Sequence, residues 1–131
     1  MNTETKRTFE RTFVGEAGER ADYPGLPQVK VWRAEATEGT PSGGSYYEAV
    51  TFTIEAAGTC PVCRGPICEA GDKAVYRTAA TVTIRPAPPV GEEQPWRVTV
   101  WHDGEWLTDP EVIRAISRCL DHAAREVEEW S

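Results

Sequence analysis

Alternating apolar and polar positions predict a series of β-strands over the first hundred residues. The clearest strand lies between Tyr46 and Ala56, where Val50, Phe52 and Ile54 share one face and mostly polar residues occupy the other. Similar patterns predict further strands over residues 8–14, 28–36, 73–85 and 96–102. Segments rich in glycine and proline separate most of these strands and are expected to be loops.

The strands over 46–56 and 73–85 are expected to pair as a hairpin whose tip is the segment 58–72. A tip of this length without regular structure is unusual in a compact domain and needs something to hold it in place. In the second of these strands the alternation predicts one common face for Tyr76, Thr78, Ala80, Val82 and Ile84.

One helix is predicted, over about residues 109–130. Thr108 and Glu111 have the spacing of a capping pair, and Pro110 suits the first helical turn. Apolar residues then recur at helical spacing up to Trp130, with charged residues on the opposite side. The chain is therefore expected to be a single α+β domain over residues 1–131, an antiparallel sheet of about five strands with this helix packed on one face.

Composition narrows the classes of function. The net charge is −7 and the basic residues are scattered, so binding to nucleic acid or to an anionic membrane is not expected. The N-terminal residues 1–7 contain no apolar segment of a secretory leader, which predicts a cytoplasmic protein with reduced thiols. None of the usual active-site motifs is present, so the sequence favours a non-catalytic protein over an enzyme.

Cysteines are the clearest candidates for chemistry, because Cys60, Cys63 and Cys68 fall within nine residues. A structural zinc ion needs four ligands from thiolates and imidazoles. We expect Cys60 and Cys63 to be joined by Cys119 and His122, which are three apart on the predicted helix. Zinc would then tie the hairpin tip to the helix. Cys68 is the alternative ligand, with one of Cys119, His122 or His102 completing the set.

The segment from Cys60 to Ile67, with Pro61 and Gly65 around the second cysteine, resembles one zinc knuckle of the treble-clef, ribbon and RING-type families. The resemblance covers less than a tenth of the chain, and the second knuckle of those families is missing. It therefore implies a metal-binding turn and does not bring the functions of those families with it. Two readings without a structural zinc ion stay open, a thiol redox or metal-sensing site and simple burial of the cysteines.

Tryptophans are the candidates for contact with a partner. Trp101 is expected on the sheet face away from the helix, beside Trp32, with Trp106 in the turn that follows. Tryptophan is frequent at binding hot spots, although all of these side chains could instead belong to the core. The expected function is a small protein that binds another protein, of the inhibitor, immunity or phage-antagonist type, or that associates with itself. The alternative is a small-molecule pocket between the sheet and the loops at 15–27 and 37–45.

Overall fold

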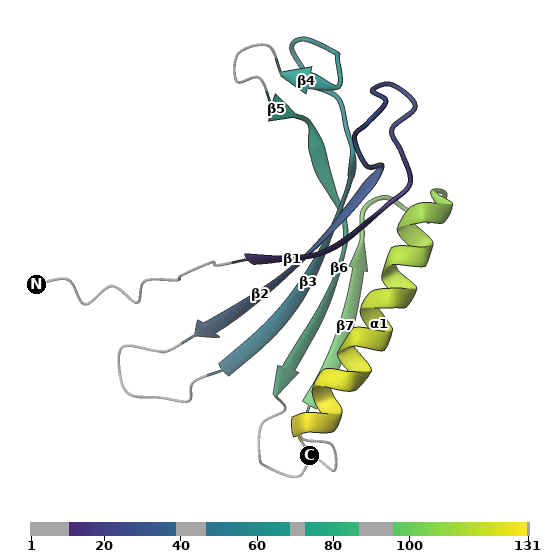
Figure 1. Cartoon of the computed structure of the whole chain (residues 1–131). Helices are drawn as coiled ribbons and strands as arrows, with labels where there is room; N and C mark the ends of the chain where they lie inside the picture. The colour runs from purple at the N-terminus through teal and green to yellow at the C-terminus, as the bar shows by residue number, and fades with distance from the viewer. Residues whose placement is uncertain (1–10, 39–46, 69–72, 87–95, 131) are drawn as a thin grey trace, which may run out of the picture.

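The computed structural model describes residues 11–38, 47–68, 73–86 and 96–130. Five strands form one antiparallel sheet in the order β1-β2-β3-β6-β7, and helix α1 packs against it (Figure 1). This confirms the predicted α+β class. The elements of the main body are β1 (Arg11–Ala17), β2 (Val29–Glu38), β3 (Tyr47–Ala57), β6 (Tyr76–Pro86), β7 (Trp96–His102) and α1 (Pro110–Trp130). Two short strands, β4 (Ile67–Cys68) and β5 (Lys73–Ala74), pair with each other outside this sheet.

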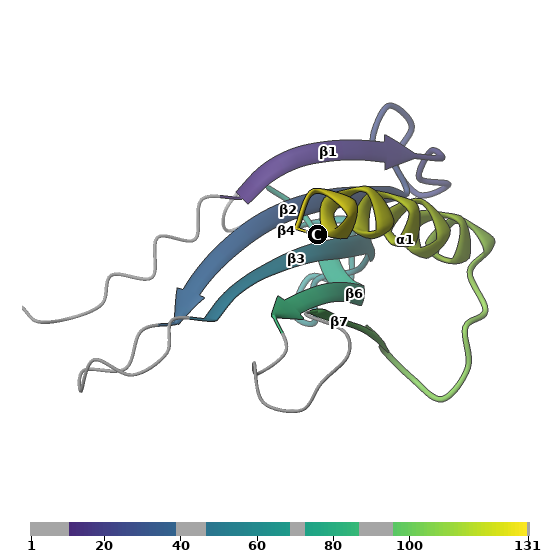
Figure 2. The same ribbon diagram turned by 90° about the horizontal axis from the view of Figure 1, so that it is seen from below.

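The hydrophobic core lies between α1 and the three strands on which it packs, β2, β3 and β6 (Figure 2). Alternation within the strands places every second side chain on the helix side. Phe52 of β3, for example, lies opposite Val82 of β6, and both side chains are buried. The helix contributes one continuous apolar stripe: Val112, Ala115, Ile116, Cys119, Ala123 and Val127.

A bulge in the β3–β6 pairing changes which face of the sheet Tyr76 and Thr78 occupy. The register shifts after Ile54, which lies opposite Ala80, so that Glu55 lies opposite Thr78. Because a one-residue shift exchanges the two faces, Tyr76 and Thr78 lie on the face away from α1. The prediction of one common face for these residues and for Ala80 was therefore wrong.

The helix is capped by Asp109 and not by the predicted Thr108. The Asp109 Oδ1 atom accepts a hydrogen bond from the backbone N–H of Glu111 at 2.9 Å, which satisfies one of the unpaired donors of the first turn. Its other carboxylate oxygen accepts a bond from the Gln28 side chain at 3.3 Å. The cap thus fixes the start of α1 to the segment that leads into β2.

The base of the hairpin loop is held by a buried arginine, Arg20, in the loop between β1 and β2. Only 1% of this residue is exposed. Its guanidinium donates to the carbonyl oxygens of Gly58 and Val75, both at 2.7 Å, and these two residues bracket the cysteine segment. Asp22 accepts two further bonds from it, at 2.8 and 3.0 Å, and raises the pKa of Arg20. Every guanidinium nitrogen therefore has an acceptor.

We expect the substitution Arg20→Met to lower the free energy of unfolding by about 2–4 kcal/mol. The new side chain would fill much of the space but leave the carbonyl oxygens of Gly58 and Val75 without a donor. The matched control is Arg77→Met, because the Arg77–Asp103 pair is more than half exposed and should be worth about 0.5 kcal/mol or less. Urea denaturation measures both, and equal midpoints for the two variants would contradict the role assigned to Arg20.

Candidate metal centre

The structure brings Cys60, Cys63 and Cys68 together at the tip of the β3–β6 hairpin, at the top of Figure 1. Their three sulfur atoms all lie within 4.8 Å of one another. The Sγ atoms of Cys60 and Cys68 are 3.8 Å apart. These residues could hold a metal ion, because thiolates are strong ligands for zinc and for other soft metals.

Backbone hydrogen bonds shape the turn that carries the first two thiols. The N–H of Arg64 donates to the carbonyl oxygen of Cys60 at 2.7 Å, and the N–H of Cys60 donates to Gly65 at 3.0 Å. Arg64 takes a positive φ of 58°, which ends the turn and reverses the chain. The result is that the N–H of Cys63 points at the Cys60 sulfur, 3.5 Å away. A backbone donor aimed at a sulfur atom favours the thiolate form.

The electrostatics of the turn favour an ionised Cys60. Backbone hydrogen bonds from Cys63 and then from Val62 lower the pKa of the Cys60 thiol from 9.0 to about 7, although partial burial acts in the opposite direction. Contacts with the thiols of Cys63 and Cys68 contribute to the same lowering of the pKa. Since the thiolate is the form that binds metal, the turn provides a partly ionised ligand before any ion arrives.

The third thiol reaches this turn through a short ribbon at the loop base. Cys68 lies on β4, which pairs with β5 so that Cys68 is opposite Lys73. Below the ribbon, the N–H of Val75 donates to Pro66 at 2.7 Å, and the N–H of Gly58 donates to Val75 at 3.0 Å. Together with Arg20, these bonds close the loop at its base and place Cys68 beside Cys60.

The structure does not bring the two predicted helix ligands to this group. Cys119 lies in the centre of the buried stripe of α1 and is fully buried in the core, where burial raises its thiol pKa to about 11. His122 stacks on the ring of Phe52, with 5.8 Å between ring centroids. The third candidate, His102, lies at the end of β7 with its Nδ1 atom 3.3 Å from the carbonyl oxygen of Asp103. The alternative ligand Cys68 completes the group of three in their place.

The residues that sequence reasoning missed are those that hold the loop. Zinc was expected to link the loop to the helix, yet Arg20 links it to the β1–β2 loop instead. An isolated arginine in a polar loop has no periodicity or spacing that marks it as buried, so the sequence contains no signal for this role. Cys68, by contrast, was predicted as the alternative ligand, since it lies close to Cys60 and Cys63 in the sequence.

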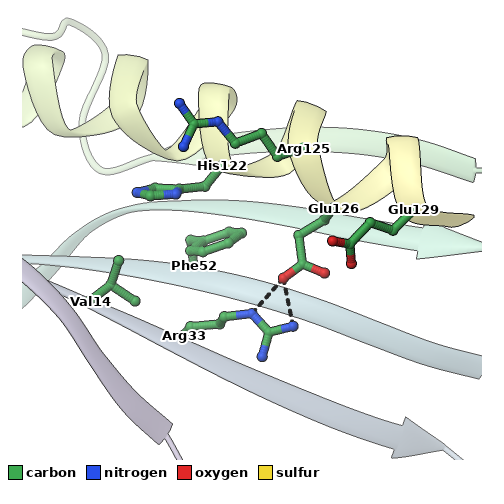
Figure 3. Close-up of a pocket in the computed structure, with 7 residues that line it drawn as sticks. All are labelled: Val14, Arg33, Phe52, His122, Arg125, Glu126 and Glu129. Carbon is green, nitrogen blue, oxygen red and sulfur yellow. Dashed lines mark hydrogen bonds and ion pairs between the residues drawn. The ribbon is translucent and has the colours of Figure 1, made fainter.

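A pocket of about 210 Å³ lies on the helix side of the sheet, beside the C-terminal half of α1 (Figure 3). Arg33 of β2 and Glu126 of α1 form an ion pair along its wall, at 2.6 Å. His122 and Phe52 form another part of the wall. Ligand pockets usually measure about 300–1,000 Å³, so this space is small for an organic molecule. Trp32 is not among the lining residues, and the predicted loop 37–45 lies almost entirely outside the described residues.

The predicted partner-binding tryptophans are separated in the structure. Trp32 and Trp101 do share the sheet face away from α1, but Thr53 and Thr81 lie between them across the strands. Trp32 is half-buried and donates from its indole nitrogen to Glu55 at 2.5 Å. Trp101 and Trp106 are 52% and 74% exposed, so these two are available for contact.

Comparison with known proteins adds no assignment: no family model, curated protein or solved structure matches this chain. In the part of the chain that the structure describes, no helix combines the length and the apolar content required to cross a membrane. The site must therefore be interpreted from its own geometry.

We expect the metal-free protein to show one thiolate step with a midpoint near pH 7, because Cys60 has a lowered pKa. Thiolate absorbance in the ultraviolet measures it during a pH titration. Cys60→Ser should remove the step, whereas Cys119→Ala should retain it. The pKa is lower in the folded state, so the stability due to this thiolate is complete above about pH 9 and is lost as the pH falls through about 7. A first step near pH 9 would contradict the proposed role of the backbone donors.

Proposed function

We propose that this chain is a small zinc-binding protein that acts by contact with another protein. Cys60, Cys63 and Cys68 hold the zinc ion, and the metal fixes the loop that makes the contact. The single observation that carries this proposal is the convergence of three sulfur atoms within 4.8 Å. It is supported by a turn whose backbone donors stabilise a thiolate.

The choice of zinc follows from the ligands. Thiolates select zinc, copper(I) or iron–sulfur clusters over magnesium and calcium, which prefer oxygen. A structural zinc site has four ligands. The described residues supply three of them, so a further side chain, a water molecule or a group from the partner takes the fourth position.

Contact with a protein is supported by the surface around the metal-binding loop. Val62 lies between the first two ligands and is 89% exposed, the highest value among the large apolar side chains that are described. An apolar residue held outward by a metal-fixed turn loses little further conformational freedom when it binds. This reduction in entropic cost is the advantage that zinc would give to a binding loop.

We expect one zinc ion per chain, measured by elemental analysis after gel filtration. Cys60→Ser, Cys63→Ser and Cys68→Ser should each weaken zinc binding by more than the roughly 10–100-fold typical of changes outside the ligand shell. Cys119→Ala is the control and should bind zinc as the unchanged chain does, since Cys119 lies in the core. Cobalt substitution gives a second readout, because thiolate ligands produce charge-transfer absorption.

Three other outcomes would contradict a zinc site formed by Cys60, Cys63 and Cys68. If the purified chain contained no metal, and if Cys60 and Cys68 formed a disulfide under mild oxidation, a thiol redox function would be favoured. The two sulfur atoms are already 3.8 Å apart. Zinc that remains after all three serine substitutions would locate the site elsewhere. Equal loss of zinc in the Cys119→Ala control would show that Cys119 is a ligand and that zinc links the loop to the helix.

A further inference from the structure

The outer edge of β7, the last strand of the sheet, has no strand paired to it among the described residues, and the strand itself offers little of the usual protection against pairing. Its register with β6 is regular along its whole length, from Trp96 opposite Pro86 to His102 opposite Ala80. The strand contains no proline and no lysine, and its single charged side chain, Arg97, lies on the face away from α1. Free edges are usually blunted by such residues or by a bulge.

The opposite edge strand, β1, shows that protection. Its pairing with β2 is interrupted by a bulge between Phe13 and Gly15. The strand also carries the charged residues Arg11 and Glu16, both exposed. A bulge and charges both disfavour the addition of another strand. The two edges therefore differ in regularity, because β1 has a bulge whereas the pairing of β7 has none, and β7 is the one suited to pairing.

Exposed apolar side chains lie near the β7 edge on the helix side of the sheet. Val100 points to that side, and yet it is 45% exposed because α1 packs on β2, β3 and β6. On the helix, Ile113 and Leu120 are 45% and 42% exposed. Around the helix, Ile113 and Leu120 lie on one side of the buried stripe, and Glu126 lies on the other side. Because Glu126 pairs with Arg33 of β2, the side of α1 that carries Ile113 and Leu120 is turned toward β7.

We infer that β7 pairs with β7 of a second copy of this chain, antiparallel and centred on Thr99, to form a twofold dimer with one continuous sheet. This is the twofold register in which all seven residues of the strand have an opposite residue. Thr99 then faces its own copy. An isologous contact of this kind closes on itself and forms no fibre.

The residues that this register places opposite each other are chemically complementary. On the helix side, Val98 lies opposite Val100 of the second copy, and each pair occurs twice by symmetry. On the other side, Arg97 lies opposite Trp101 of the second copy, a cation and an aromatic ring. Trp101 is exposed in the single chain and becomes covered in the dimer. Backbone N–H and C=O groups of both edges gain partners.

Sedimentation analysis over a concentration series tests this inference. We expect a particle of twice the chain mass, with and without zinc, because β7 lies outside the cysteine loop. Val100→Lys should weaken the dimer roughly 100-fold, since the substitution places two like charges in the interface. The matched control is Phe13→Lys on β1, where the side chain is similarly exposed, at 46%, and the dimer should persist.

A monomeric chain at every concentration would overturn the inference, and so would equal dimer mass in Val100→Lys and Phe13→Lys. Circular dichroism establishes that each variant is folded. If Val100→Lys does not fold, hydrogen exchange of the unchanged chain decides. Amides of β7 should become more protected as the concentration rises, and protection independent of concentration would rule out this pairing.

Discussion

The buried guanidinium of Arg20 is the interaction on which the cysteine loop depends. It joins the β1–β2 loop to the carbonyl oxygens of Gly58 and Val75, which stand on either side of the cysteine segment. A charged group this deeply buried is tolerated because each of its three nitrogens donates to Asp22 or to one of the two carbonyl oxygens. The loop is thereby closed at its base by the protein itself, so the proposed metal ion would have only to organise the tip.

Separate contacts hold the base of the loop and the turn after Cys60, and together they bring the three thiols close before an ion binds. Arg20 and the β4–β5 ribbon set the separation of the two sides of the loop, while the turn after Cys60 aims a backbone N–H at its sulfur. The same donors lower the pKa of this thiol to about 7, so little free energy is needed to ionise it at neutral pH. By contrast, Cys119 is surrounded by core side chains, which disfavour ionisation.

Much of the fold could be predicted from alternation and helical periodicity, because both report which side chains face the core. The boundaries of β7 and the body of α1 followed directly. The bulge after Ile54, the cap at Asp109 and the burial of Arg20 could not be predicted, because each depends on contacts between segments distant in sequence. For the site, the knuckle spacing was informative about Cys60 and Cys63. Spacing on α1 could not show that Cys119 lies at the centre of the buried stripe, where a ligand cannot reach the loop.

The proposed metal centre in the cysteine loop is built on a frame that the sheet and Arg20 hold in advance. X-ray absorption spectroscopy of the zinc-loaded protein tests this most directly, since it reports the atoms bound to the ion. We expect three sulfur neighbours at about 2.3 Å, with one lighter atom or a further sulfur in the fourth position. A first shell made mainly of nitrogen and oxygen would contradict it.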